Sequence, residues 1–156
     1  MEWHQPVRVS MECTMKISLG TDHAGFAHKE ALKQHLEKAG HEVLDFGTNS
    51  VEDVDYPDFI RPAAEAVANG DSDQGVVFGG SGNGEAITAN KVHGIRCALC
   101  WNVETGRLAL QHNNANVLAL PARFIDIEGA KSSVKTFLKT EFEGGRHQRR
   151  VEKIDL

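Results

Sequence analysis

Residues 75–85 have the sequence GVVFGGSGNGE, in which an apolar run is followed by a loop with four glycines in residues 79–84. Residues 86–92 then have the pattern of a helix. A strand, a glycine loop and a helix in this order direct free backbone N–H groups at an anion. The loop also ends in a carboxylate, Glu85, in the first turn of the expected helix. An anion site beside a base suits chemistry that removes a proton and creates negative charge on a substrate.

Two commoner glycine motifs do not fit this loop. The dinucleotide fingerprint G-x-G-x-x-G would require a glycine where the chain has Glu85. The P-loop motif G-x-x-x-x-G-K-[ST] would require a lysine at the same position. A plain turn without a ligand is the other alternative. It is disfavoured because so many glycines cost backbone entropy in folding.

The composition indicates one globular domain without a general affinity for nucleic acid. The chain has 156 residues, of which 40% are hydrophobic and 25% charged, and these values are ordinary for a globular protein with a single core. A net charge of −5 opposes binding to a phosphate backbone, whereas a small phosphorylated ligand needs only a local group of arginines. No apolar stretch reaches membrane-spanning length and no signal-peptide pattern begins the chain, so no membrane partner is expected.

The cysteines are predicted to be core thiols. Cys13, Cys97 and Cys100 form no plausible disulfide framework and fit a reducing compartment, which predicts a cytoplasmic location. Cys97 and Cys100 match the C-x-x-C spacing, but they lie in residues 95–101, which read as a buried strand. Residues i and i+3 of a strand point to opposite faces of the sheet. Packed core thiols are therefore favoured over a redox or zinc-binding pair.

From Met15 onward, strand patterns alternate with helix patterns. Such alternation predicts right-handed crossovers and a parallel sheet. We therefore expect a three-layer, Rossmann-like α/β domain at residues 15–156, with a five-stranded parallel sheet, helices on both faces and a basic C-terminal tail. The first fourteen residues are polar and aperiodic, and they are predicted to be a disordered N-terminal extension. Strands are expected at 16–20, 41–46, 74–78, 95–101 and 117–120, and helices at 25–39, 57–69, 86–92, 103–112 and 128–142.

Ligands of parallel sheets bind beyond the carboxyl ends of the strands. This rule selects Asp22 and His23 after the first strand, the glycine loop after the third, and Arg123 after the fifth. Asp22 could simply cap the following helix, or it could bind a substrate hydroxyl. His23 could lie near a phosphate or a ring oxygen. The sequence leaves both alternatives open.

Two further groups of polar residues are candidates for the site. His112 ends a helical segment, where it could bind the last carbonyls or exchange a proton with a sugar hydroxyl that Asn113 also holds. Arg146 and Arg150 would share one helix face and could bind one phosphate, although a solvated charged end is the ordinary alternative. No adequate set of metal ligands is evident, and Ser81 does not lie in the G-x-S-x-G motif of a serine nucleophile.

Taken together, these residues resemble ribose-5-phosphate isomerase type B, a family that also includes galactose-6-phosphate and tetrulose-phosphate isomerases. The resemblance runs from about Met15 to Ile154. Each motif is modest by itself, but five motifs in the same order are highly specific. They are residues 20–25 (GTDHAG), 55–57 (DYP), 79–91 (GGSGNGEAITANK), 111–113 (QHN) and 145–150 (GRHQRR).

One departure from the family pattern concerns the base. Many members carry a cysteine base immediately before the glycine loop, where this chain has Gly79. The chain instead resembles the subgroup whose loop ends in a glutamate base, which corresponds to Glu85. Neither Cys97 nor Cys100 occupies the missing position, so thiol chemistry is not expected.

The resemblance implies a metal-free, cofactor-free aldose–ketose isomerase that acts through an enediolate. Glu85 would be the base, His112 would assist ring opening with Asp22 orienting the hydroxyls, and the family's homodimer (possibly a dimer of dimers) would place the C-terminal arginines in the neighbouring site. Substrate contacts are implied for Asp22, His23, Gly80, Ser81, Gly82, Asn83, Gly84, Asn113, Arg123, Arg146 and Arg150, and Ser81 is also implied to help stabilise the oxyanion.

The sequence leaves the substrate open. Ribose 5-phosphate and ribulose 5-phosphate are the default of the family, but erythrulose phosphates or a hexose phosphate would require only changes around Asn83, Trp101 and Asn102. A non-catalytic sugar-phosphate-binding protein is the alternative class. The presence of both Glu85 and His112 favours the enzyme.

Overall fold

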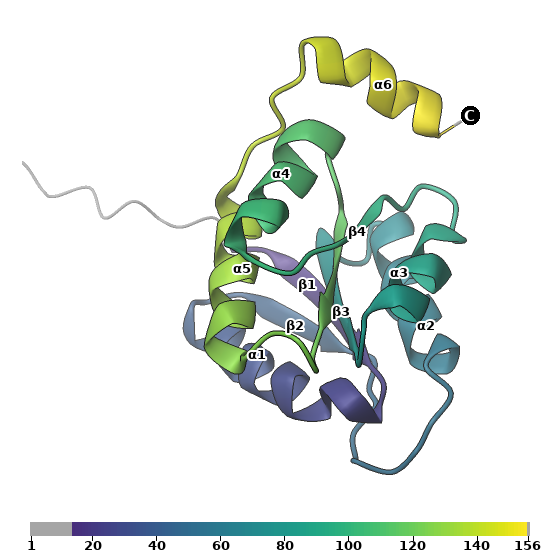
Figure 1. Cartoon of the computed structure of the whole chain (residues 1–156), viewed down its shortest axis with the longest axis vertical. Helices are drawn as coiled ribbons and strands as arrows, with labels where there is room; N and C mark the ends of the chain where they lie inside the picture. Colours follow the sequence, from purple (N-terminus) through teal and green to yellow (C-terminus); the bar gives the residue numbers. More distant parts are fainter. Residues whose placement is uncertain (1–13, 156) are drawn as a thin grey trace, which may run out of the picture.

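The computed structural model describes residues 14–155 of the chain. Five parallel strands in this range form one sheet in the order β2-β1-β3-β5-β4 (Figure 1). The strands are β1 (Lys16–Thr21), β2 (Glu42–Asp45), β3 (Gln74–Gly79), β4 (Cys97–Leu99) and β5 (Val117–Pro121). The helices are the 3-10 turn η1 (His23–Gly25) and α1 (Phe26–Lys38), α2 (Pro57–Ala68), α3 (Asn83–Asn90), α4 (Val103–Asn113), α5 (Ile127–Lys139) and α6 (Arg146–Ile154).

Helices cover the sheet on both faces. Leu32 of α1, Leu110 of α4 and Phe137 of α5 belong to one buried apolar cluster, and Ile60 of α2 and Ala89 of α3 belong to the other. Most residues of the central strands β1, β3 and β5 are buried and apolar, as parallel strands with both faces covered must be. The predicted three-layer α/β fold with a five-stranded parallel sheet is therefore confirmed.

The ends of several elements differ from the predictions. Helix α3 begins at Asn83 rather than at residue 86, because the left-handed Gly82 turns the chain directly from the loop into the helix. Strand β4 covers only Cys97–Leu99 instead of residues 95–101. The basic tail is helical and forms α6. The predicted extension, residues 1–14, lies outside the described residues except for its last residue, and it stays a prediction.

The connections between strands diverge at the carboxyl edge of the sheet. The chain leaves β1 through α1 on one face, whereas it leaves β3 through α3 on the other face. Strands β1 and β3 are neighbours, so their following loops diverge at this point. Such a switch point is where open α/β sheets bind ligands. The fold therefore positions a site between Asp22 and the glycine loop.

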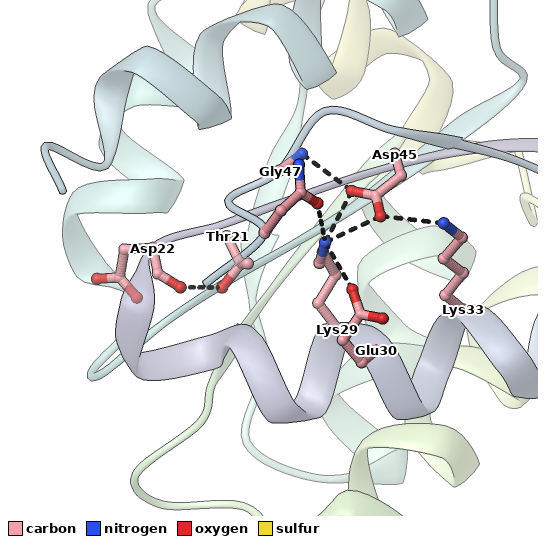
Figure 2. A network of polar contacts seen from close by, with 8 residues as sticks. Thr21, Asp22, Lys29, Glu30, Lys33, Asp45 and Gly47 are labelled. Atoms are coloured by element: carbon pink, nitrogen blue, oxygen red, sulfur yellow. Dashed lines mark hydrogen bonds and ion pairs between the residues drawn. The ribbon is translucent and has the colours of Figure 1, made fainter. Parts of the chain in front are cut away.

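A buried ion pair stabilises the chain beside the carboxyl end of β1. Lys29 of α1 is fully buried, and its Nζ donates to both carboxylate oxygens of Asp45, each at 2.9 Å (Figure 2). Asp45 also accepts from the backbone N–H of Gly47 at 2.9 Å. The carbonyl of Gly47 then accepts from the N–H of Thr21, the residue before Asp22, at 2.8 Å. Lys29 thus fixes the segment that lies beside the end of β1.

We expect Lys29→Met to destabilise the protein by about 3 kcal/mol, since removing one partner of a buried pair is costly and, in the described part of the chain, Asp45 then keeps only the half-exposed Lys33, at 3.3 Å, as an ion-pair partner. Burial alone would raise the pKa of Asp45, but the bonds from Lys29 and Gly47 hold it below its usual value. A lowered carboxylate pKa stabilises the fold above its unfolded pKa of about 4, and the stabilisation is lost as the pH falls through the folded pKa. Denaturant titrations between pH 3 and 7 should show this acid-dependent loss in the wild type and a smaller one in Lys29→Met. The exposed Lys38→Met on the same helix is the control, and an unchanged stability of Lys29→Met would refute the role.

Candidate active site

The carboxyl group of Glu85 lies in the space that a side chain at position 79 would occupy. A Cβ atom built on Gly79 would be 2.0 Å from Cδ of Glu85 and 2.1–2.2 Å from its two oxygens. Glu85 is only 4% exposed. Burial raises the pKa of Glu85, and the negative charge of nearby Asp22 raises it further, against the lowering effect of a backbone hydrogen bond. A carboxyl group with a raised pKa is suited to removing and returning a proton near neutral pH.

The glycine loop is closely packed from outside. Gly82 is left-handed at φ 80°, and a Cβ there would lie 2.6 Å from Cδ1 of Leu99. The ring of Tyr56 covers Gly84 at a similar distance. A side chain at Gly82 would also be strained by the positive φ, and a side chain at Gly84 would displace the ring of Tyr56. The loop and the start of α3 therefore present backbone N–H groups that can bind an anion.

Asp22 and His23 follow β1 as predicted. The Oδ1 atom of Asp22 accepts from the N–H groups of Ala24 and Gly25 at 2.9 and 3.2 Å, so the capping role is confirmed, and Oδ2 can still contact a ligand. His23 is held by the loop before α2: its Nδ1 accepts from the N–H of Val54 at 3.3 Å, which places the proton of the neutral ring on Nε2.

Arg123 joins this group from the end of β5. Its backbone N–H donates to the carbonyl of Gly80 at 3.1 Å, and the N–H of Ala122 donates to the carbonyl of Gly79 at 2.8 Å. The guanidinium group lies 3.1–3.2 Å from the Cβ position of Gly80. The carboxyl edge of the sheet therefore brings together two carboxylates, an imidazole, an arginine and the glycine loop.

His112 and Asn113 lie at the opposite edge of the sheet from Asp22 and the glycine loop. Helix α4 runs from the carboxyl end of β4 back to the amino end of β5. The carbonyl of Asn113 accepts from Nε of Arg96, the residue before β4. Strand β3 separates the two edges by its six residues, which corresponds to roughly 20 Å. The two groups of predicted site residues therefore do not meet within one chain.

The C-terminal helix accompanies His112. Arg146 and Arg150 are exposed on α6, and Arg96 forms an ion pair with Asp155 after the end of this helix at 2.9 Å. Figure 1 shows α6 beyond the C-terminal end of α4, at the far end of the molecule from η1. The second group thus contains His112, Asn113 and the two arginines.

One side chain of this second group was missed in the sequence. Glu143 lies within 3.8 Å of both His112 and His147, and these three could be considered as metal ligands. The two imidazole rings are stacked, however, with centroids 4.4 Å apart and planes 12° apart. An ion bound by an imidazole nitrogen lies near the plane of that ring, and two stacked parallel rings share no such point. The cluster is therefore not arranged to hold a metal ion.

Cys97 and Cys100 are free thiols away from the glycine loop, as predicted. Burial raises the pKa of both, that of Cys100 to about 11, so neither forms a reactive thiolate near neutral pH. Among residues 14–155, no helix has the length and apolar character needed to cross a membrane.

A parallel α/β sheet with a buried carboxylate in an anion-binding loop suits an enzyme that moves protons on small anionic substrates. The family model described as Ribose/Galactose Isomerase matches residues 17–154. The chain therefore belongs to the ribose/galactose isomerase family. The prediction that it is a sugar-phosphate isomerase interconverting aldoses and ketoses is thereby confirmed.

Similar proteins share nearly the whole length of the chain. Ribose-5-phosphate isomerase B of Mycolicibacterium paratuberculosis is 48% identical over 141 residues, which are 88% of each chain. The structure of ribose-5-phosphate isomerase B from Clostridium thermocellum is 50% identical, with a TM-score of 0.89 over 90% of this chain and 95% of that one. The enzyme from Mycoplasma genitalium with bound ribulose-5-phosphate is 42% identical, with a TM-score of 0.86 over 90% and 93%.

We expect Gly79→Ala to displace the carboxyl group of Glu85 and to reduce isomerase activity at least tenfold. The added methyl group would overlap the carboxylate, and overpacking of this kind costs about 1–3 kcal/mol. In the double variant Gly79→Ala/Glu85→Ala the overlap is gone. Its loss of unfolding free energy should therefore be smaller than the sum of the losses in the two single variants, and close to the loss in Glu85→Ala alone. Gly106→Ala is the control, because its Cβ would meet no atom closer than 3.4 Å. Strictly additive stabilities would contradict the overlap.

Proposed function

We propose that this protein interconverts ribose 5-phosphate and ribulose 5-phosphate through an enediolate, without a metal ion, and that it does so as a homodimer. The observation that carries the proposal is the buried carboxyl group of Glu85 beside the N–H groups of the glycine loop. The names of the similar proteins, and the ribulose-5-phosphate bound in one of them, support the choice of a five-carbon substrate. The cytoplasmic location stays a prediction.

Glu85 is the base in this mechanism. It takes the proton from C2 of the open-chain aldose, the electron pair forms the C1–C2 double bond, and the negative charge moves to O1. Glu85 then returns the proton to C1, while the hydroxyl proton of O2 is transferred to O1, which yields the ketose. The raised pKa of Glu85 supports this role, since the same group must be both a base and an acid.

The remaining groups at the carboxyl edge bind the substrate. N–H groups from Gly80 to Gly84, with the hydroxyl of Ser81, stabilise the developing oxyanion and need no rearrangement during the reaction. Asp22 orients the sugar hydroxyls with its free oxygen, and Asn83 lies beside them at the start of α3. His23 and Arg123 bind the phosphate from this side.

A second copy of the chain completes the site. His112 and Asn113 lie roughly 20 Å from Glu85 by the length of β3, which is too far for one sugar phosphate to reach both. A twofold dimer that places the amino edge of one chain against the carboxyl edge of the other forms two complete sites. The exposed aromatic rings of Tyr56, Trp101 and Phe124 surround the carboxyl edge and support its burial by a partner.

In this dimer the partner contributes the ring-opening group and the remaining phosphate ligands. His112 donates a proton to the ring oxygen O4 of the cyclic aldose as the C1–O4 bond breaks, and the C1 hydroxyl loses its proton to solvent to form the aldehyde, while Asn113 binds the neighbouring hydroxyls. Arg146 and Arg150 bind the phosphate from the exposed face of α6.

A non-catalytic binding protein would not exchange substrate hydrogen with solvent deuterium. A panel of four-, five- and six-carbon sugar phosphates tests the substrate.

Glu85→Gln should lower kcat by ~10²–10⁴, the usual contribution of a positioned base, with little effect on substrate binding. In the wild type, kcat should fall as the pH drops through the raised pKa of Glu85, hence at a higher pH than an ordinary glutamate would give. Steady-state kinetics from pH 4 to 8 and a binding titration check both expectations. The exposed Glu65→Gln on α2 is a matched control. Near-normal turnover in Glu85→Gln would exclude Glu85 as the base.

The shared site predicts complementation between two inactive variants. Refolding Glu85→Gln together with Arg146→Ala/Arg150→Ala should restore roughly a quarter of wild-type activity, because half of the randomly mixed dimers carry one intact site. Each variant refolded alone is the control, and differently tagged chains verify the heterodimers. If the arginines served their own chain, each site would keep one defect. Verified heterodimers without activity would therefore refute the shared site but not the reaction.

A further inference from the structure

His112 and His147 form a stacked pair above one carboxylate. Their ring centroids are 4.4 Å apart and their planes differ by 12°. The Nε2 atom of His112 lies 3.8 Å from Oε2 of Glu143, and the Nε2 atom of His147 lies 3.8 Å from Oε1. The two rings come from α4 and α6, and Glu143 comes from the connection between α5 and α6. Three segments therefore converge on this carboxylate.

Glu143 is held at this position by its backbone. Its N–H donates to the carbonyl of Gln111, the residue before His112, at 3.0 Å. The following Gly144 and Gly145 are left-handed at φ 69° and 53°, and they turn the chain into α6. The N–H of His147 donates to the carbonyl of Gly144 at 3.0 Å. The carboxylate is thus tied to the last turn of α4 and to the first turn of α6.

The ring of His147 is buried under the ring of His112 and is not exposed to bind substrate. It is only 7% exposed, and its Nε2 has no hydrogen-bond partner among residues 14–155. Burial lowers the pKa of His147, positive charge on His112, Arg146 and Arg150 lowers it too, and Glu143 opposes them. These are the charged groups that face the pair. A neutral ring can stack on His112 without competing with it for the negative charge of Glu143.

We propose that Glu143 is a positioning residue for His112, holding its ring against His147 in the orientation from which a proton reaches the sugar ring oxygen. This inference rests on the proposed ring-opening role of His112. The distance of 3.8 Å is longer than a hydrogen bond, but contacts of catalytic groups commonly tighten when substrate binds. His147 limits the rotation of His112, so that the proton is delivered in one direction.

The test separates ring opening from proton transfer at carbon. Ribulose 5-phosphate carries its phosphate on the C5 hydroxyl and cannot close the five-membered ring. Deuterium exchange at its C1 therefore needs the base but not ring opening, whereas turnover of ribose 5-phosphate needs both. Glu143→Gln should lower kcat for ribose 5-phosphate by roughly 10-fold, part of the ~10²–10⁴ of a positioned acid. It should leave KM and the rate of exchange within about twofold.

Controls distinguish failure of the inference from failure of the proposed function. The exposed Glu141→Gln, two residues earlier, should change neither rate. Glu85→Gln should lose both rates, and His112→Ala should lose only turnover of ribose 5-phosphate. If His112→Ala loses both the turnover of ribose 5-phosphate and the deuterium exchange of ribulose 5-phosphate, or keeps both, the ring-opening role is refuted. If His112→Ala is selective but Glu143→Gln lowers both rates equally or changes none, the positioning role is refuted.

A measurement without substrate tests the contact itself. NMR spectra of the histidine-labelled full-length protein should show that the ring signals of His112 and His147 move in Glu143→Gln and stay in place in Glu141→Gln. Thermal unfolding verifies that both variants are folded. Ring signals that are unchanged in folded Glu143→Gln would overturn the proposal, whatever the kinetics. Glu143→Asp, which keeps the charge on a shorter side chain, should recover part of the lost turnover, and no recovery would also overturn it.

Discussion

The carboxyl group of Glu85 occupies the volume that a side chain at position 79 would fill, and the rest of the site depends on this steric constraint. Only glycine at 79 leaves room for the carboxylate. The loop must then pass under Tyr56 and against Leu99, where an added side chain would collide with these residues. Because the carboxylate is buried there, its pKa is raised, and the loop beside it leads into the N-terminus of α3, whose backbone N–H groups suit an anion. Packing and chemistry have the same cause.

The charged residues of the proposed site come from both edges of the sheet. Asp22 and Glu85 lie at the carboxyl edge, whereas His112, Arg146 and Arg150 lie at the amino edge or beyond it on α6. In the proposed dimer each edge meets its complement, which steers association and fixes the orientation of the two chains. The opposite placement explains how a protein with a net charge of −5 can bind a phosphate dianion. The basic groups are local, and in the proposed dimer Arg146 and Arg150 come from the partner chain.

Much of the fold was predictable because it depends on local patterns. The apolar runs of β1, β3 and β5 are strands that are buried on both faces, and the turns at Gly40, Gly70 and Gly82 have the left-handed backbone that glycine favours. The rule for ligands at carboxyl ends of strands correctly grouped Asp22, His23, Arg123 and the glycine loop. The same rule does not apply to His112, which lies at the end of a helix before a strand. Family resemblance named His112 but could not place it.

The sequence by itself determined the order of the elements, the parallel sheet, the family and the glutamate in place of the cysteine, since each follows from residues close together in the chain. Only the tertiary structure decided which distant side chains meet. The burial of Lys29 against Asp45 and the stacking of His112 on His147 join residues that no periodicity connects. The separation of Glu85 from His112 was likewise decided by tertiary structure, because it depends on the direction in which α4 crosses the sheet. Side-chain contacts of this kind depend on the packing of whole helices, and no local pattern of residues encodes them.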